Sequence, residues 1–504
     1  MRAHRTALLC LAAALTMASD GVLAQKMGGR GPSPNIGISK PPTVPDGPRG
    51  GGGYPGGGHR GPGWGGVVPG IIVGLPQGYS TGPYIVDDGP SGPRRTQANR
   101  RGTSGVPPAN ERRIVPDEVV IELPNSVSAQ QIEALQRRHR LTRRESQAFQ
   151  LSGTTLYRWG ITGGRSVATV VRELEADRLV AWAQPNYLFM LQQNETRTAG
   201  DAAQYGLAKL RLPQAHVLAK GDNVLVAVID SGIDGNHPEL AGSIAGTFDA
   251  LSAPAAPHQH GTAIASLIAA HGKLMGSAPD AKILAARAFD PKAAGAEGTT
   301  FNILKSLDWA AAQGARVINM SFAGPDDPAI HRSLEAARKK GIVLVAAAGN
   351  AGAKSPPLYP AADPNVIAVS ATDADDKLFE QSNRGRYITV AAPGAQILVA
   401  IPDKGYEMSS GTSYSAAEVS GIVALMLQRK PDLTPDKVKT ILRATAKDLG
   451  PKGPDAMFGA GLADAYGAIT ADVAPVAAAG FPPAVPKPPA MTLMKLRFIA
   501  WHMM

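Results

Sequence analysis

The chain has 504 residues, enough for two or three domains with a large buried core. Its formal net charge is +10, but residues 25–113 hold 11 Lys and Arg against 4 Asp and Glu, and residues 1–24 add one further positive charge. Residues 114–504 therefore carry only +2, which gives them no strong attraction to nucleic acid and argues against such a partner.

Residues 1–24 have the features of an export signal. Arg2 and Arg5 precede an apolar run, and Val22-Leu23-Ala24 supplies the small residues of a cleavage site. The only cysteine, Cys10, lies in this run, so the mature chain has no disulfides. Since no other segment approaches the ~18 uninterrupted apolar residues of a membrane span, we expect a secreted or periplasmic protein without a transmembrane segment.

Two segments of biased composition flank the expected folded part. Residues 25–113 are rich in Gly, Pro and Arg and cannot bury enough apolar surface to offset their ordering entropy, which predicts disorder. Residues 471–504 begin as a Pro/Ala-rich linker. The last fourteen residues are either a short interfacial or docking segment or disordered.

Residues 114–195 read as a small α+β unit in a split β-α-β order. Alternating or β-branched stretches predict strands, and stretches with helical periodicity after a serine cap predict helices. The expected strands are 118–123, 156–159 and 180–187, and the expected helices are 128–138 and 166–176.

Residues 205–470 alternate continuous apolar strands with helical segments. Such strands with helical crossovers predict an α/β fold in which helices cover both faces of a parallel sheet, with chemistry at the carboxyl ends of the strands. The expected strands are 224–229, 317–320, 342–346 and 366–369, and the helices include 300–313 and 331–340.

Three polar residues lie at the ends of these apolar segments. Asp230 ends a strand, His260 opens an apolar helix and Asn350 follows the stretch VAAAG. Each has an ordinary structural explanation, respectively a turn cap, a buried histidine and turn chemistry. Together with Ser413, which leads into another apolar helix, they supply the nucleophile, base, orienting carboxylate and oxyanion donor of acyl transfer.

The sequence around these residues resembles the subtilisin family of serine proteases. VAVIDSGID, HGT and GTSYSAAEVSG are similar to the family's aspartate, histidine and serine motifs, and NMSFAGP, AAAGN, YPAADPNVIAVSA, SNRG, VAAPG and FGAGLADA match further blocks over residues 205–470. The resemblance implies a three-layer subtilisin-like catalytic domain and a secreted serine endopeptidase that cleaves proteins or peptides. Ser413 would attack the scissile carbonyl, His260 take its proton, Asp230 orient His260, and Asn350 bind the oxyanion.

The resemblance also implies residues that bind substrate. Ser321, Phe322 and Ala323 would pair with the substrate backbone, and a pocket for the residue before the cut would be lined by Ala347 and Gly349 with Leu358 at its floor. We expect a shallow pocket that prefers small or medium apolar side chains.

Two departures from the family pattern stand out. Ala417-Glu418 replaces the usual Pro-His, and an acid in the first turns of a helix is favoured by the helix dipole. The segment 271–279 has no room for the family's calcium loop, so we expect no metal there and no cofactor; the sequence does not decide whether calcium binds at another site.

The unit at 114–195 sits where subtilisin-like zymogens carry a ferredoxin-like propeptide, and AQPNYLF resembles the end of such domains. It would act as an intramolecular inhibitor and folding aid of a monomeric enzyme, released by a cut between Met190 and Tyr205. Two alternatives stay open: a binding protein that uses the protease fold as a scaffold, and a zymogen permanently blocked by its propeptide.

Overall fold

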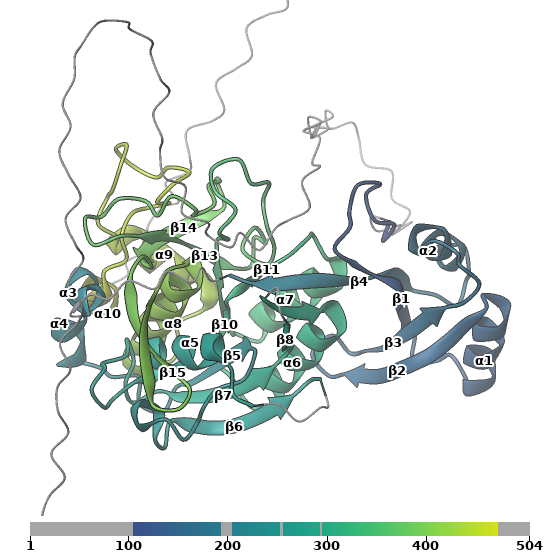
Figure 1. The fold of residues 1–504 in the computed structure, drawn as a ribbon, viewed down its shortest axis with the longest axis horizontal. Helices are drawn as coiled ribbons and strands as arrows, with labels where there is room; N and C mark the ends of the chain where they lie inside the picture. Colours follow the sequence, from purple (N-terminus) through teal and green to yellow (C-terminus); the bar gives the residue numbers. More distant parts are fainter. Residues whose placement is uncertain (1–103, 193–203, 252–255, 293–294, 472–504) are drawn as a thin grey trace, which may run out of the picture. The chain divides into compact units, whose positions relative to one another are not determined.

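The computed structural model describes residues 104–192, 204–251, 256–292 and 295–471 (Figure 1). The predictions made for the export signal, most of the Gly/Pro-rich leader and nearly all of the C-terminal tail lie outside these residues. Within them, no helix is long and apolar enough to cross a membrane.

The first described unit is a four-stranded antiparallel sheet with strand order β2-β3-β1-β4. Val119 and Ile121 of β1 pack in one core with Leu135 and Leu174 of the two helices. The predicted helices and strands are present; β2 was missed because its end residues alone are buried, so it shows no apolar alternation. The elements are β1 (Ile114–Leu123), α1 (Ala129–Arg138), β2 (Leu141–Phe149), β3 (Thr154–Ile161), α2 (Val167–Glu175) and β4 (Trp182–Leu191).

The second unit is built on a seven-stranded sheet in the order β14-β13-β12-β10-β5-β7-β6, and every neighbouring pair is parallel. This confirms the predicted parallel sheet. Its strands are β5 (Leu225–Asp230), β6 (Ile244–Asp249), β7 (Lys282–Arg287), β10 (Val317–Met320), β12 (Val343–Ala347), β13 (Ile367–Thr372) and β14 (Ile388–Pro393).

Helices cover both faces of this sheet. Val226 and Val228 belong to the core shared with α5 (Gln259–Ala269) and α8 (Thr412–Arg429). The intervening residues Ala227 and Ile229 face the core shared with α6 (Thr300–Ala312) and α7 (Pro328–Lys339). Because side chains alternate along a strand, burial of both sets explains why these strands read as continuous apolar runs.

Shorter elements complete the unit. They include an antiparallel hairpin of β15 (Ile397–Ile401) and β16 (Gly405–Ser409) and a 3-10 turn (Pro238–Leu240). There are also four further helices, α3 (Tyr205–Lys209), α4 (Leu212–His216), α9 (Pro435–Thr445) and α10 (Ala465–Thr470). Three more strands, β8 (Phe289–Lys292), β9 (Gly295–Thr299) and β11 (Phe322–Ala323), bring the second unit against the first.

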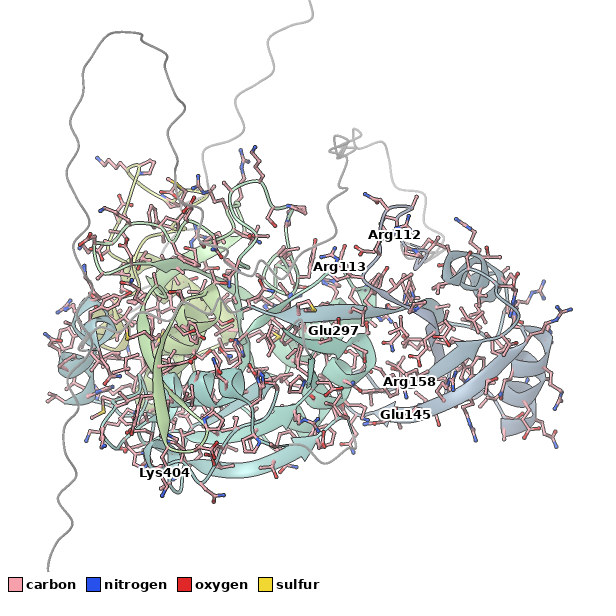
Figure 2. All side chains as sticks on the ribbon, viewed as in Figure 1. Arg112, Arg113, Glu145, Arg158, Glu297 and Lys404 are labelled. Carbon is pink, nitrogen blue, oxygen red and sulfur yellow. The ribbon has the colours of Figure 1, made fainter. Side chains whose placement is uncertain are left out.

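The two units share a continuous sheet through β4. Its first part pairs with β1, and its last residues lie between β9 and β11, since Met190 lies opposite Glu297 of β9 on one side and Ala323 of β11 on the other. Ion pairs of Glu145 support the junction. Lys305 Nζ of α6 lies 2.8 Å from Glu145 Oε1, and Arg158 Nη2 lies 3.4 Å from Glu145 Oε2. Figure 2 shows Glu145 and Arg158 on the neighbouring strands β2 and β3. The end of β4 is held at the carboxyl edge of the large sheet by its pairing with β11, which directly follows β10 in the chain.

Candidate active site

The three residues predicted to form a catalytic triad gather at the carboxyl edge of the parallel sheet. Asp230 is the last residue of β5, while His260 and Ser413 are each the second residue of a helix, α5 and α8. All three are fully buried. Since parallel strands end at a common edge, residues far apart in sequence meet there.

Asp230 and His260 are directly hydrogen bonded. His260 Nδ1 lies 2.8 Å and 2.9 Å from the two carboxylate oxygens, and Asp230 Oδ1 also accepts the backbone N–H of Ser231 at 2.8 Å. A carboxylate can only accept, so the proton of neutral His260 is on Nδ1 and Nε2 is the basic nitrogen. Nε2 is buried and has no hydrogen-bond partner among the described residues.

The Ser413 hydroxyl points to carbonyl oxygens instead of His260. Its Oγ donates to the main-chain oxygen of Gln192 and lies 3.1 Å from that of Ser321. The Ser321 hydroxyl in turn donates to the Ser413 carbonyl at 3.2 Å, which ties the start of α8 to the end of β10. The structure therefore joins two members of the triad by hydrogen bonds and turns the third toward a carbonyl group.

Asn350 presents an unpaired donor beside Ser413. Its Oδ1 accepts the backbone N–H and the hydroxyl of Thr412 at 3.0 Å and 2.8 Å, which orients the amide. Its Nδ2 is buried without a partner in the described part of the chain. Gly349 makes the preceding turn at φ +108°, where a Cβ would lie 2.4 Å from Asn383 Nδ2. An oriented N–H with no acceptor is what a developing oxyanion requires.

The predicted substrate-binding strand is paired with an extended segment, and that segment is the end of β4. Phe322 lies opposite Leu191 and Ala323 opposite Met190, and Gln192 donates its backbone N–H to Ser321 O at 3.1 Å. The Gln192 side chain accepts the backbone N–H of Asn350 at 2.9 Å. The chain's own strand thus lies along the edge that was predicted to hold a substrate.

The remaining pocket residues divide into two groups. Leu358 lies beside Gly349, since a Cβ on that glycine would be 3.1 Å from Leu358 Cδ1. The Ala347 side chain instead belongs to the core on the face covered by α5 and α8. Alternate residues of β12 face opposite sides of the sheet, and the place of Ala347 in a pocket wall stays a prediction.

Phe189 is a contact residue that sequence reasoning did not single out. It is fully buried, and its ring meets the Phe322 ring edge-on at a centroid distance of 6.0 Å. A Cβ on Gly324 would come within 2.2 Å of the Phe189 ring, so this glycine makes room for it. The signal was present in the segment AQPNYLF, but the register of β4 against β11 was needed to interpret it.

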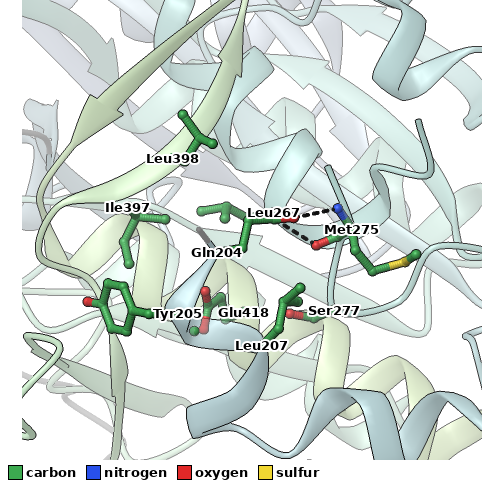
Figure 3. Close-up of a pocket in the computed structure, with 10 residues that line it drawn as sticks. Gln204, Tyr205, Leu207, Leu267, Met275, Ser277, Ile397, Leu398 and Glu418 are labelled. Carbon is green, nitrogen blue, oxygen red and sulfur yellow. Dashed lines mark hydrogen bonds between the residues drawn. The ribbon is translucent and has the colours of Figure 1, made fainter. Parts of the chain in front are cut away.

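Glu418, which the sequence suggested as a helix-stabilising acid, is buried. Its side chain lies in a small hollow lined by Tyr205, Leu207, Leu267 and Ile397, among others, and Oε2 has no hydrogen-bond partner within the described ranges (Figure 3). Burial raises the pKa of Glu418 well above its usual value. The raised pKa favours the neutral acid, which gains less from the helix dipole than a carboxylate would.

A carboxylate organises the short segment after α5. Glu239 accepts the backbone N–H groups of Gly272, Lys273 and Leu274 at 2.9–3.0 Å and the Tyr406 hydroxyl at 2.7 Å. Burial alone would raise the pKa of Glu239, but the Tyr406 hydroxyl and these N–H groups together lower it. Donor hydrogens converge on this carboxylate, so its surroundings do not fit a cation, which needs oxygen ligands.

Comparison with known proteins agrees with this architecture of a serine endopeptidase. The model of the subtilase family matches residues 221–461. Thermitase from Thermoactinomyces vulgaris is 34% identical over 274 residues, which cover 53% of this chain and 95% of that protein. Subtilisin E from Bacillus subtilis (strain 168) is 33% identical over 292 residues, covering 56% of this chain and 74% of the relative.

A solved structure shows the same fold. Fervidolysin from Fervidobacterium pennivorans, described as a keratinolytic enzyme related to subtilisin, aligns with a TM-score of 0.62 at 24% identity and covers 72% of this chain and 62% of its own. The chain belongs to the subtilase family and is a subtilisin-like serine-type endopeptidase.

Proposed function

We propose that the enzyme hydrolyses peptide bonds through an acyl-enzyme formed on Ser413, with His260 as general base and Asp230 as its orienting carboxylate. The hydroxyl of Ser413 turns to His260 Nε2, adds to the scissile carbonyl and passes its proton to Nε2. His260 then protonates the leaving amine, and water releases the acyl group by the reverse sequence. The observation that carries this proposal is the hydrogen bond from His260 Nδ1 to Asp230, which leaves a basic Nε2.

Asn350 Nδ2 and the Ser413 backbone N–H are proposed to stabilise the oxyanion. The orientation of the Asn350 amide by Thr412 supports this, because a donor fixed in advance costs no reorganisation as charge develops. Ser321, Phe322 and Ala323 hold the substrate backbone, while Gly349 and Leu358 border the pocket for the residue before the cut.

We further propose that residues 114–195 form a ferredoxin-like inhibitory propeptide and that the protein is a self-processing zymogen. The main-chain oxygen of Gln192 accepts the Ser413 hydroxyl, and the preceding residues occupy the substrate edge. Gln192 thus stands where the residue before a scissile bond belongs. The bond cut during maturation is then Gln192–Gln193, within the range predicted from sequence.

Contacts made by the propeptide support its role in folding. Gln184 Oε1 accepts the backbone N–H of Ala329 at 3.1 Å, and Asn186 Oδ1 accepts that of Phe301 at 3.3 Å. These N–H groups belong to the first turns of α7 and α6, which have no intrahelical partners. The N-cap residue Asp327 also accepts the Ala329 N–H, at 2.9 Å, so the propeptide adds a second acceptor at the start of α7 and supplies one for Phe301 at the start of α6. Both helices belong to a parallel α/β domain, a topology that folds slowly unaided.

Gln192 bears on substrate choice as well. A glutamine beside Ser413 favours a pocket that accepts a polar, medium-sized side chain, whereas the sequence alone suggested small or medium apolar ones. A peptide library with Gln, Ala, Leu or Phe before the cut separates these: preference for Gln supports the maturation bond, and efficient cleavage after Phe alone contradicts both expectations.

The wider setting follows the family. We propose an exported, monomeric enzyme acting on protein or peptide substrates, without a cofactor and without calcium at the segment 271–279. In the described residues no cluster of three or more His, Cys, Asp or Glu side chains could hold a metal ion. A carbonyl-rich calcium site elsewhere would appear as chelator-sensitive thermal stability.

The test is intact-mass analysis of the purified chain beside Ser413→Ala, with Ser146→Ala, an exposed serine of β2, as matched control. We expect the native chain and the control to mature with Gln193 as the new N-terminus and Ser413→Ala to stay uncut at that bond. The same cut in Ser413→Ala would refute self-processing. Full-length native chain that never hydrolyses a peptide would favour the permanently blocked zymogen.

A further inference from the structure

A second histidine lies next to the triad. His258 precedes α5 as its N-cap residue, two positions before His260, and its Nδ1 accepts the His260 backbone N–H at 3.4 Å. Its Nδ1 is also 2.7 Å from the hydroxyl of Ser231, the residue that directly follows Asp230. The proposed mechanism assigns no role to either residue.

Ser231 connects this histidine to the catalytic carboxylate. The fully buried Ser231 has its Oγ 2.9 Å from Asp230 Oδ1, the same oxygen that lies 2.8 Å from His260 Nδ1. A continuous series of hydrogen bonds therefore runs from His258 through Ser231 and Asp230 to His260.

The hydrogen bonds along this series can be directed in two ways, depending on where the protons lie. A serine hydroxyl has one hydrogen and cannot donate to two acceptors at once. When Nδ1 of His258 carries a proton, it gives up the 3.4 Å hydrogen bond from the His260 N–H and donates to Ser231 Oγ, and the hydroxyl donates to Asp230. When Nδ1 is bare, the hydroxyl can donate to it, and Asp230 loses one donor. The protonation of His258 thus determines which hydrogen bonds the catalytic aspartate accepts.

Other charged groups border this region. Arg287, at the end of β7, flanks Gly232 together with the backbone nitrogen of His258. Its guanidinium is paired with Asp249 at 2.9 Å and lies 3.9 Å from Asp290. Glu407 of β16 accepts the side chain of Gln259 at 2.6 Å. A histidine such as His258 ordinarily changes charge between pH 5 and 8.

We propose that His258 is a positioning residue that, through the Ser231 hydroxyl, controls the charge available at Asp230 and extends hydrolysis to lower pH. This rests on the proposed roles of Asp230 and His260. A cation at His258, with the hydroxyl fixed on Asp230, opposes a second positive charge on His260. His260 therefore stays neutral, and able to act as a base, further into the acidic range.

The experiment compares pH profiles of kcat/KM, per active site titrated with a fluorophosphonate, for the matured wild type and His258→Asn. The asparagine amide can still donate to Ser231 but carries no charge. We expect the acidic limb to move to higher pH by about 0.5 to 1 unit, of the size that a neighbouring charge produces. The alkaline plateau should change much less. His258→Gln serves if the first variant does not mature.

Two controls separate this role from a structural one. His271→Asn removes an imidazole just beyond the other end of α5 and should leave the limb unchanged. In a Ser231→Ala background, the shift caused by His258→Asn should shrink, because the connection is cut. A uniform loss of rate with superimposable normalised profiles would refute the inference alone. A wild type without Ser413-dependent hydrolysis would refute the proposed function, and this inference with it.

Discussion

Glu418→Gln should change how the free energy of unfolding depends on pH. The substitution keeps the size of the side chain and removes its titration. Glu418 is 5% exposed and its Oε2 has no partner in the part of the chain that the structure describes, so burial raises its pKa. Above pH ~4.3, the ordinary pKa of glutamate, the carboxyl group of the unfolded chain loses its proton, whereas that of the folded chain keeps it up to a higher pH.

The magnitude follows from linkage. Above the pKa of the unfolded carboxyl group, the folded state holds one proton more than the unfolded state, so stability falls as pH rises. The slope is about 1.4 kcal/mol per pH unit until pH reaches the raised pKa of folded Glu418. Glutamine carries no such cost. The free energy of unfolding of the variant, relative to that of the parent, should therefore rise by about 1.4 kcal/mol per pH unit over this range. A constant difference caused by the amide would not change this slope.

The assay is denaturant unfolding from pH 4 to pH 8 in a Ser413→Ala background, which prevents self-digestion. Glu380→Gln, at an exposed glutamate, is the matched control. We expect the Glu418→Gln curve to diverge upward from the parent with rising pH and the control to follow the parent. Parallel curves for Glu418→Gln and the parent would show that the carboxyl group is solvated or paired, and the reasoning would be wrong.

Two further predictions concern the site and the segment after α5. Asn350→Ala should lower kcat by ~10² to 10³ with a much smaller effect on KM, measured by steady-state peptide hydrolysis, because the donor acts on charge that develops in the transition state; a purely raised KM would contradict this. Glu239→Gln should destabilise the fold by about 2–3 kcal/mol near pH 7, since hydrogen bonds to a charged acceptor are lost. Because the folded pKa of Glu239 is lowered, its contribution is present above ~4.3 and lost below it, so thermal unfolding curves of parent and variant should converge in acid.

The parallel sheet could be predicted from sequence because its strands are buried on both faces. Val226 to Ile229 read as a continuous apolar run for that reason. By contrast, β2 carries polar residues on both faces, and nothing in its pattern marks a strand. Periodicity detects burial, so it misses strands that contribute little to a core.

The triad was predicted from motifs, but the state of its members was not. Sequence indicates that Ser413 and His260 belong together, yet the orientation of the Ser413 hydroxyl depends on which carbonyl group lies nearby. That carbonyl belongs to Gln192, and the register of β4 against β11 determines its position. Likewise, the link from His258 to Asp230 depends on side-chain geometry that spacing alone does not give.

The most direct measurement is labelling by a fluorophosphonate probe of the matured wild type, Ser413→Ala and His260→Ala, with mass mapping of the labelled peptide. Under the proposed self-processing, the Ser413→Ala and His260→Ala chains would not mature, so residues 114–192 are removed from them by limited digestion. We predict one label per wild-type chain, located on Ser413, no label on Ser413→Ala, and a labelling rate for His260→Ala that is lower by several orders of magnitude. Equal labelling of all three chains, or a wild type that stays unlabelled after its propeptide is removed, would contradict an activated Ser413.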